Sequence, residues 1–483
     1  MPCTYSRLHD RYVSSKGKST SCVTLVVVLG CLTVIGILLA IAVLKRPPAP
    51  KDHETFPQEA GWSNFSTDQC SMALVESIPQ QMKYKGNVTL GIPLENVWKD
   101  LISMATEQVE VASFYWTLTG EDINVNSSSD IPGRDILKDL EELPSRNVSV
   151  RLVTSVPSVP TNSTDLKILK QKGVQVRKVN FGRLTRGVLH SKFWIVDRKH
   201  VFIGSANMDW RALTQVKELG VVVYNCSSLA KDLHKIFQSY WVMGQSHSSL
   251  PQPWPSKYDT AINKHHPLLV RSDNVSSRLY LTGSPPSFCP PSRTQDLEAI
   301  LSIISEAQHY VDVAVMEYFP TTRFERPQRY WPFIDEAIRT AAFERKVKMR
   351  MLISCGRDSD PAMLPFLKSL ASMDSPHQDI SIQIKLYIVP VGNQTDIPYT
   401  RVNHNKYMVT DKVAYIGTSN WSGDYFLTTA GVGLVISQHA PRPVWKTKAI
   451  QGQLRAVFDR DWNSEFAVHL ADLGHHPDCA LSR

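Results

Sequence analysis

The sequence predicts an α/β fold of two tandem halves related by a pseudo-twofold axis, each a mostly parallel sheet flanked by helices, behind one N-terminal transmembrane helix. Three observations predict it: an apolar run near the N-terminus, an internal repeat over most of the remaining chain, and strand-like segments that alternate with helical ones. At 483 residues, 42% hydrophobic and 20% charged, the composition is globular, with length for about two to three domain-sized cores.

The apolar run spans residues 22–44 and contains no charged residue. About 20 apolar residues are enough to cross a bilayer as a helix. A cleaved signal peptide is the alternative, but its apolar region would be about 7–15 residues long and end in small residues, whereas this run is followed by Lys45-Arg46-Pro47-Pro48. We expect a cytoplasmic tail at 1–21, a membrane anchor at 22–44 and an exposed stalk at 45–68, where cleavage would release a soluble form.

The orientation of the anchor follows from its glycosylation sequons. Basic residues on the two sides are nearly balanced, so charge alone does not decide. Nine Asn-x-Ser/Thr sequons occur, and all follow the apolar run, which indicates a type II protein with a luminal body. Sequons also arise by chance, and Asn420 belongs to a motif described below. The expected glycosylation sites are Asn64, Asn87, Asn126, Asn147, Asn162, Asn225, Asn274 and Asn393.

Five of the eight cysteines fall in the expected luminal part, Cys70, Cys226, Cys289, Cys355 and Cys479. The lumen is oxidising, and an odd number leaves one thiol unpaired, but spacing does not give the pairing. No Cys/His cluster has zinc-ligand spacing, so we expect no metal site of that kind. The net charge of +8 suits a polyanionic substrate such as nucleic acid or anionic lipid, and equally suits a mildly basic secretory protein.

The luminal body, divided into a first half at 69–275 and a second at 276–483, repeats the same elements in the same order. Predicted strands pair as 108–113 with 310–315, 148–154 with 347–353, 174–179 with 382–389 and 220–224 with 431–437. Predicted helices pair as 134–143 with 332–343, and as the helices that end at Trp241 and Trp462. Two such halves suggest one site at their interface.

A phosphate-handling motif occurs once in each half. The first copy has His190-Ser191-Lys192, Asp197 and Gly204-Ser205-Ala206-Asn207; the second has His404-Asn405-Lys406, Asp411 and Gly417-Thr418-Ser419-Asn420. In a strand, residues two apart share a face, so each motif presents an imidazole and an ammonium together. The following turn brings hydroxyl, backbone and amide donors toward the same anion.

This duplicated pattern resembles the signature of the phospholipase D superfamily, His-x-Lys, four residues, Asp, then Gly-Ser-x-Asn. The resemblance covers most of residues 70–470. Stretches 112–116, 204–210, 214–220 and 401–408 look like the vertebrate membrane-anchored members three and four, and stretches 182–192, 316–323 and 390–393 look closer to member four. The resemblance also implies the disulfides Cys70–Cys226 and Cys355–Cys479, with Cys289 free.

The resemblance implies a two-step displacement in which one histidine attacks phosphorus and the other protonates the leaving oxygen and then activates water or an alcohol. Lys192, Lys406, Asn207 and Asn420 would hold the nonbridging oxygens together with the histidines. Asp197 and Asp411 would orient the motifs. This mechanism needs no cofactor and no catalytic metal, and it is compatible with a structural divalent cation.

One asymmetry of the repeat suggests which histidine attacks. Glu218 precedes the strand 220–224, whereas the matching position in the second half is Ala430 or Gly431. A carboxylate can fix the tautomer of an imidazole, so we expect Glu218 to orient His190 as the nucleophile and His404 to act as general acid and base. A surface ion pair of Glu218 with Lys217 or Arg211 is the alternative.

Three functions remain open on the sequence. The resemblance implies an endolysosomal 5′-to-3′ exonuclease that degrades single-stranded DNA and RNA and limits nucleic-acid sensing by innate receptors. Lipid phosphodiester hydrolysis or headgroup exchange on lysosomal phospholipids is the second, and a noncatalytic scaffold the third. The aromatics Phe114, Tyr115, Trp116, Tyr318 and Phe319 would stack on bases or belong to the core, and the core is favoured.

The expected location is a single-pass protein of the endoplasmic reticulum, Golgi, endosome and lysosome. Tyr5-Ser6-Arg7-Leu8 in the tail has the tyrosine-x-x-bulky pattern that endosomal sorting adaptors bind. An acidic lumen suits a protonated histidine acid, because histidine titrates at about pH 6.5. A homodimer is a further expectation.

Overall fold

A computed structural model describes residues 66–482, apart from 159, 273–274 and 440–448. No helix in these ranges is both long enough and apolar enough to cross a membrane. The expected tail and anchor, the stalk up to residue 65, and the sequons at Asn64 and Asn274 lie outside the described residues.

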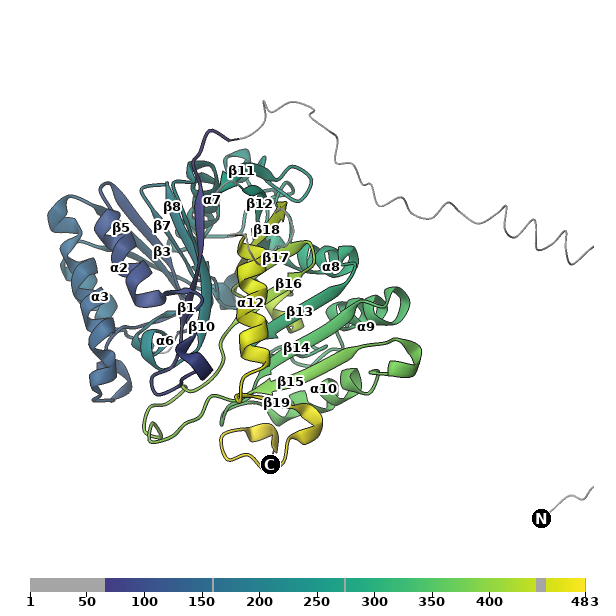
Figure 1. The fold of residues 1–483 in the computed structure, drawn as a ribbon. Coiled ribbons are helices and arrows are strands. Elements are labelled where there is room, and N and C mark those ends of the chain that lie inside the picture. Colours follow the sequence, from purple (N-terminus) through teal and green to yellow (C-terminus); the bar gives the residue numbers. More distant parts are fainter. Residues whose placement is uncertain (1–65, 159, 273–274, 440–448, 483) are drawn as a thin grey trace, which may run out of the picture. The chain divides into compact units, whose positions relative to one another are not determined.

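Two large sheets form the body, one from each half (Figure 1). In the first, the strands in spatial order are β2 (Ile92–Pro93), β1 (Ser71–Ser77), β10 (Glu218–Tyr224), β8 (His200–Gly204), β7 (Phe193–Val196), β3 (Gln108–Ala112), β5 (Ser149–Ser155) and β6 (Gln175–Val179). In the second they are β11 (Leu268–Ser272), β12 (Val275–Ser284), β18 (Gly431–His439), β17 (Val413–Gly417), β16 (Lys406–Thr410), β13 (Tyr310–Val315), β14 (Lys348–Ser354), β15 (Ile382–Tyr387) and β19 (Ala467–His469). A small pair joins β4 (Trp116–Thr117) to β9 (Met208–Asp209).

The expectation of mostly parallel sheets is wrong. The strands β3, β5 and β6, and likewise β13, β14 and β15, run parallel because helices connect them. The motif strands β7 and β8, and β16 and β17, follow one another through tight turns, and such turns join antiparallel neighbours. Each half is therefore a mixed sheet, with the parallel strands at one side and the motif strands in the middle.

Helices form three layers around the two sheets. The helices of the first half are α2 (Leu94–Met104), α3 (Ile131–Glu142), α4 (Thr164–Gln171), α5 (Phe181–Thr185), α6 (Trp210–Thr214) and α7 (Ser227–Met243); those of the second are α8 (Asp296–Glu306), α9 (Phe333–Arg345), α10 (Leu364–Ala371), α11 (Gly423–Leu427) and α12 (Ile450–Trp462). Apolar side chains of α2, α3 and α4 cover one face of the first sheet, and those of α8, α9 and α10 cover one face of the second.

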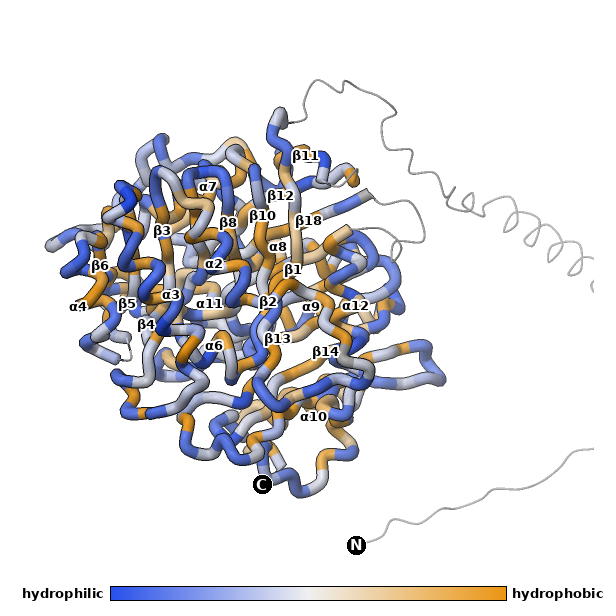
Figure 2. Tube along the Cα trace, turned by 60° about the vertical axis from the view of Figure 1, so that its left-hand side comes forward, coloured by the Kyte–Doolittle hydropathy of each residue, from blue (hydrophilic) through white to orange (hydrophobic). Residues whose placement is uncertain are grey.

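Helices α7 and α12, one from each half, lie between the sheets in one shared core. That core combines Leu233 and Phe237 of α7 with Leu454 and Phe458 of α12 and with strand residues of both sheets. Hydrophobic segments run through the body and are also found toward its edges, around β6 and α10 (Figure 2). The halves therefore share one interior, and the second sheet already begins with β11, before the expected boundary at 275.

The structure contains both implied disulfides, Cys70–Cys226 and Cys355–Cys479, and Cys289 is free. Five of the expected glycosylation asparagines are exposed: Asn126, Asn147, Asn162, Asn225 and Asn393. Asn420 is 4% exposed, which agrees with its exclusion from the expected glycosylation sites.

Candidate active site

Each His-x-Lys motif lies at the start of a fully buried strand. His190 and Lys192 directly precede β7, whereas His404 precedes β16 and Lys406 is its first residue. Both lysines are 1% exposed, and each donates from Nζ to the main-chain oxygen of its own histidine, at 2.6 Å in the first motif and 2.7 Å in the second. The two copies therefore share one local geometry.

The two motifs meet because each binds the other half through its backbone. The main-chain N–H of His190 donates to the oxygen of Ala430 at 2.9 Å, and that of His404 donates to the oxygen of Lys217 at 2.8 Å. Ala430 and Lys217 stand directly before β18 and β10. The exchange is reciprocal, so the expected single site at the interface of the halves is built from both motifs.

The imidazole of His190 is held by a carbonyl group. Its Nδ1 lies 2.9 Å from the main-chain oxygen of Thr418, which places the proton on Nδ1 and leaves Nε2 with a free electron pair. His190 is 7% exposed, and the rings of Phe114 and Tyr425 lie 5.5 and 5.0 Å from it, centroid to centroid. A neutral imidazole in this setting is suited to attack phosphorus.

Glu218 orients His404, and the expectation that it orients His190 is wrong. The two carboxylate oxygens of Glu218 lie 3.0 and 2.9 Å from Nδ1 of His404. Ser205 fixes the carboxylate by donating from Oγ to Oε2 at 2.5 Å. The expected surface ion pair does not describe Glu218 either, because its side chain is only 4% exposed. A carboxylate at Nδ1 favours the protonated imidazole, which suits a proton donor.

The second half has no room for an equivalent carboxylate. The matched backbone bonds of His190 and His404 pair Ala430 with Lys217, and therefore Gly431 with Glu218. A Cβ atom added at Gly431 would lie 2.2 Å from Oγ of Ser419 and 2.8 Å from Oγ of Ser284. Any side chain there would displace these serines, so the site is asymmetric by construction.

Burial and mutual repulsion set the protonation of the site. Burial, followed by the charges of Lys192 and Lys406, lowers the pKa of His190 far below its usual value. Burial also lowers the pKa of His404, but Glu218 opposes this effect. The pKa of Lys406 falls to about 7 through burial, opposed by Glu218 and Glu317. His190 is therefore the more easily neutral of the two histidines.

The two motif asparagines are buried at the site with amide atoms to spare. Asn207 and Asn420 are each 4% exposed, and Oδ1 of each has no hydrogen-bond partner among the described residues. Nδ2 of Asn420 donates to Glu317 and to the hydroxyl of Tyr425, both at 3.1 Å. Both unpaired Oδ1 atoms are acceptors, so they suit a donor such as a hydroxyl group or a water molecule and not a phosphate oxygen.

Glu317 and Tyr425 were not predicted from the sequence. Glu317 pairs with Arg323 at 2.7 Å and follows β13 at the edge where the parallel strands end. An acidic residue just past a buried strand at that edge was a usable signal. Tyr425 has no such signal, because it reaches His190 from the short helix α11.

Asp197 and Asp411 lie at the far ends of the motif strands and touch neither imidazole. Asp197 accepts from Oγ1 and N of Thr106 and from the backbone of Glu107 and Gln108, at 2.7–2.9 Å. Asp411 accepts from the backbone of Gln308 and His309 at 3.0 Å. These bonds fix the starts of β3 and β13 beside the motif strands. The supporting role agrees with these contacts, whereas a catalytic role does not.

The aromatic residues divide between core and site. Trp116 and Tyr318 are each 1% exposed and Phe319 is 2% exposed, so the favoured core interpretation holds for them. Phe114 and Tyr115 are half-buried. Phe114 faces His190, and its ring lies 5.9 Å from Nζ of Lys192.

In the described part of the chain, one group of side chains has the spacing of metal ligands: Asp68, Cys70 and Cys226. Both of these cysteines are in the disulfide, so they offer no thiolate. The motif residues themselves are imidazoles, ammonium groups and amides, a set suited to an anion.

Comparison with known proteins agrees with the duplicated motif. A family model described as PLD3/4, PLD-like domain, matches residues 87–392. The chain is 51% identical over 413 residues to the human protein named 5'-3' exonuclease PLD4, covering 85% of this chain and 81% of that one. It is 49% identical over 401 residues to the Xenopus tropicalis protein named 5'-3' exonuclease PLD3, covering 83% and 81%. Among solved structures, phosphatidylserine synthase of Haemophilus influenzae Rd KW20 is similar in fold, with a TM-score of 0.51 at 14% identity over 79% of this chain and 88% of that one.

Proposed function

Since the chain belongs to the PLD3/4 family of phospholipase D-like proteins, we propose that it is a 5′-to-3′ exonuclease that cleaves single-stranded DNA and RNA through a phosphohistidine. The observation that carries the proposal is the single interface site in which one buried imidazole faces a carbonyl and the other a carboxylate. A nucleophile must be neutral and an acid protonated, and these two settings favour those two states.

In the first step, Nε2 of His190 attacks phosphorus, and a P–N bond forms as the P–O bond to the leaving group breaks. His404 gives its Nε2 proton to the leaving oxygen. In the second step His404 takes a proton from water, whose oxygen attacks phosphorus, and the P–N bond to His190 breaks. Lys192 and Lys406 stabilise the charge that builds on the nonbridging oxygens.

We propose the same roles for His190 and His404 that the sequence suggests, but for the opposite reason. Glu218 was expected to mark the nucleophile, whereas here it marks the acid and base, because a carboxylate stabilises the charged imidazole. His190 needs no such partner, since its task begins in the neutral state. Nδ2 of Asn207 would donate to the phosphate, and Nδ2 of Asn420 would do so in exchange for its bond to Tyr425.

A single strand suits the surroundings of the site. Phe114 stands against His190, and the ring of Phe324, 64% exposed, lies 6.4 Å from that of Tyr425. Aromatic rings beside a cationic site stack on bases of any sequence, and an unpaired strand has free base faces. We infer that these rings hold the terminal nucleotide.

The proposed location is the endolysosomal lumen, with a type II anchor at 22–44 and adaptor binding at Tyr5. Two disulfides and five exposed sequons support a luminal body. The lowered pKa of His404 supports an acidic compartment, because the proton donor is charged only below its pKa. Degradation of nucleic acid there would limit innate sensing. Clipping of the stalk and a homodimer complete the proposal.

The test is digestion of 5′-blocked and 3′-blocked single strands of DNA and RNA, and of phosphatidylglycerol, by the full chain in detergent at acid pH. Loss of activity on only the 5′-blocked strands supports the proposal. Turnover of the lipid alone would replace it with the lipid phosphodiesterase. No turnover of any substrate, with wild type matching His190→Ala, would leave the scaffold function.

A further inference from the structure

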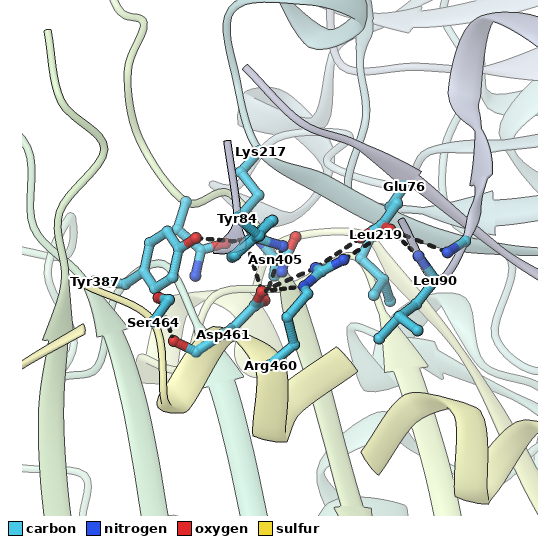
Figure 3. A network of polar contacts seen from close by, with 12 residues as sticks. Glu76, Tyr84, Leu90, Lys217, Leu219, Tyr387, Asn405, Arg460, Asp461 and Ser464 are labelled. Atoms are coloured by element: carbon cyan, nitrogen blue, oxygen red, sulfur yellow. Dashed lines mark hydrogen bonds and ion pairs between the residues drawn. The ribbon is translucent and has the colours of Figure 1, made fainter. Parts of the chain in front are cut away.

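A buried cluster of charged and phenolic side chains lies across the two halves (Figure 3). We call it the Asp461 cluster, and its members are Glu76, Tyr84, Lys217, Tyr387, Arg460 and Asp461. They come from β1, from the loop after it, from the residue before β10, from β15 and from the end of α12. None of them belongs to the duplicated motif.

The centre of the cluster is an ion pair in the protein interior. Nζ of Lys217 lies 2.9 Å from Oδ2 of Asp461, and both side chains are 0% exposed. Tyr84 donates from its hydroxyl to Oδ1 of Asp461 at 2.6 Å, and Arg460 binds the same oxygen at 2.8 Å. Arg460 also pairs with Glu76 at 2.8 Å. Several hydrogen bonds thus fix the Asp461 carboxylate before it meets Lys217.

Such a pair is poorly explained by stability alone. Desolvation of two charges offsets most of their attraction, and apolar pairs of similar size often stabilise a fold as well. What the pair does provide is a fixed position, because a buried lysine must stay with its carboxylate.

The backbone of Lys217 is part of the active site. Its carbonyl accepts the N–H of His404 at 2.8 Å, and its N–H donates to the oxygen of Val402 at 3.0 Å. The next residue is Glu218, whose carboxylate holds Nδ1 of His404. Neighbouring side chains of an extended chain point to opposite sides, so Lys217 faces Asp461 while Glu218 faces the imidazole.

The pseudo-symmetric counterpart of this ion pair is uncharged. Ala430 and Gly431 match Lys217 and Glu218, and by the repeat Tyr240 of α7 matches Asp461 of α12. The hydroxyl of Tyr240 lies 3.0 Å from Oγ of Ser191, a neutral contact. The buried charge pair therefore occurs on the side where a carboxylate has to be held against a histidine.

We propose that Asp461 and Lys217 are positioning residues for the proton-transfer histidine: Asp461 anchors Lys217, and this anchor sets the place of the Glu218 carboxylate and of the His404 backbone. The inference rests on the proposed function for the role of His404. The charged and titratable groups that interact with His404 are Glu218, Lys406, Lys192 and His190. Glu218 is the only negative group among them, so its displacement lowers the pKa of His404.

The test is the Asp461→Asn variant, followed by the NMR titration of the His404 imidazole and by pH profiles of kcat and KM. We expect the pKa of His404 to fall by about half a unit or more, because its negative partner moves away. The basic limb of kcat should shift to lower pH, with kcat down about 10-fold and KM little changed. The imidazole titration needs no turnover, so it tests the positioning even if the proposed function fails.

The matched control is Asp232→Asn on α7. Asp232 and Arg293 also form a buried pair at 2.8 Å, with exposures of 3% and 2%, but neither residue touches His404 or Glu218. This variant should lose stability and keep the His404 titration. If Asp461→Asn does not fold, Lys217→Met with Asp461→Leu removes both charges and retains apolar packing. If Asp461→Asn, or the double variant in its place, folds and leaves the His404 titration unchanged, the inference is overturned.

Discussion

His190 and His404 occupy equivalent places in the two halves, yet they hold their Nδ1 protons against different partners. His190 faces the carbonyl of Thr418 and His404 faces the carboxylate of Glu218. A carbonyl fixes the tautomer and leaves the ring neutral, whereas a carboxylate also stabilises the positive charge. The difference teaches that one motif can serve two chemical roles when only its neighbour changes.

Removal of either histidine should have the largest effect, and the two losses should differ in kind. His190→Ala removes the nucleophile, and we expect kcat to fall on the order of 10^4-fold or more. His404→Ala removes the proton donor, for which a loss of about 10²–10⁴-fold is expected. With a substrate whose leaving group needs no proton, such as a p-nitrophenyl phosphodiester, His404→Ala alone should accumulate a phosphorylated protein, measured by mass spectrometry. Accumulation in His190→Ala instead would reverse the roles.

Glu218→Gln should break the asymmetry while it keeps the shape of the site. The neutral amide no longer raises the pKa of His404, so this pKa falls and a smaller fraction of the imidazole is protonated at any given pH. We expect kcat to drop about 10²-fold and its basic limb to move to lower pH. A pH profile of kcat measures this. An upward shift of that limb, or a change confined to the acidic limb, would show that Glu218 acts on His190.

Gly431→Ala tests whether the second half can accept a side chain where Glu218 stands in the first. The added Cβ would press on Ser419 and Ser284, and such overpacking costs about 1–3 kcal/mol of unfolding free energy. Thermal or urea unfolding measures the loss. Gly220→Ala, in the first half, is a poor control because its Cβ would also clash, at 2.7 Å from Phe202. Gly474→Ala, which meets nothing within 4 Å, is the better one and should be nearly neutral.

The two motif aspartates should show the smallest difference. Asp197 accepts four hydrogen bonds, whereas Asp411 accepts two at 3.0 Å. Each substitution to alanine should lower the free energy of unfolding by about 1–3 kcal/mol, with the larger loss in Asp197→Ala. Urea unfolding of the two variants side by side gives the comparison. The effect should fall on stability. A loss of kcat in fully folded protein comparable to that of Glu218→Gln would restore a catalytic role to these residues.

The parts of this site that the sequence predicted are local ones. The His-x-Lys spacing and its repeat predicted one site from both motifs, although His190, Lys192 and His404 precede the motif strands and only Lys406 lies in one. The alternation of apolar and polar residues likewise located the strands 108–113 and 310–315, seen as β3 and β13. Local spacing, however, does not give strand direction, so the antiparallel motif strands were missed.

The partner of Glu218 could not be predicted, because sequence distance pointed the wrong way. Glu218 is 28 residues from His190 and 186 from His404, yet it binds the more distant one. The contact depends on the arrangement of the halves around the pseudo-twofold axis, which no segment of the chain encodes by itself. Tyr425 and the Asp461 cluster escaped notice for the same reason, since each acts across that boundary.

The reciprocal bonds between the motifs and the opposite halves also bear on how such a site can diverge. In a symmetric dimer of identical halves, every substitution appears twice, so a carboxylate placed beside one histidine appears beside the other. A single polypeptide with two covalently joined copies is free of that constraint. Mutation at residue 218 can then change the pKa of the proton donor His404 while residue 431 stays glycine. The nucleophile and the acid can therefore evolve separately within one gene.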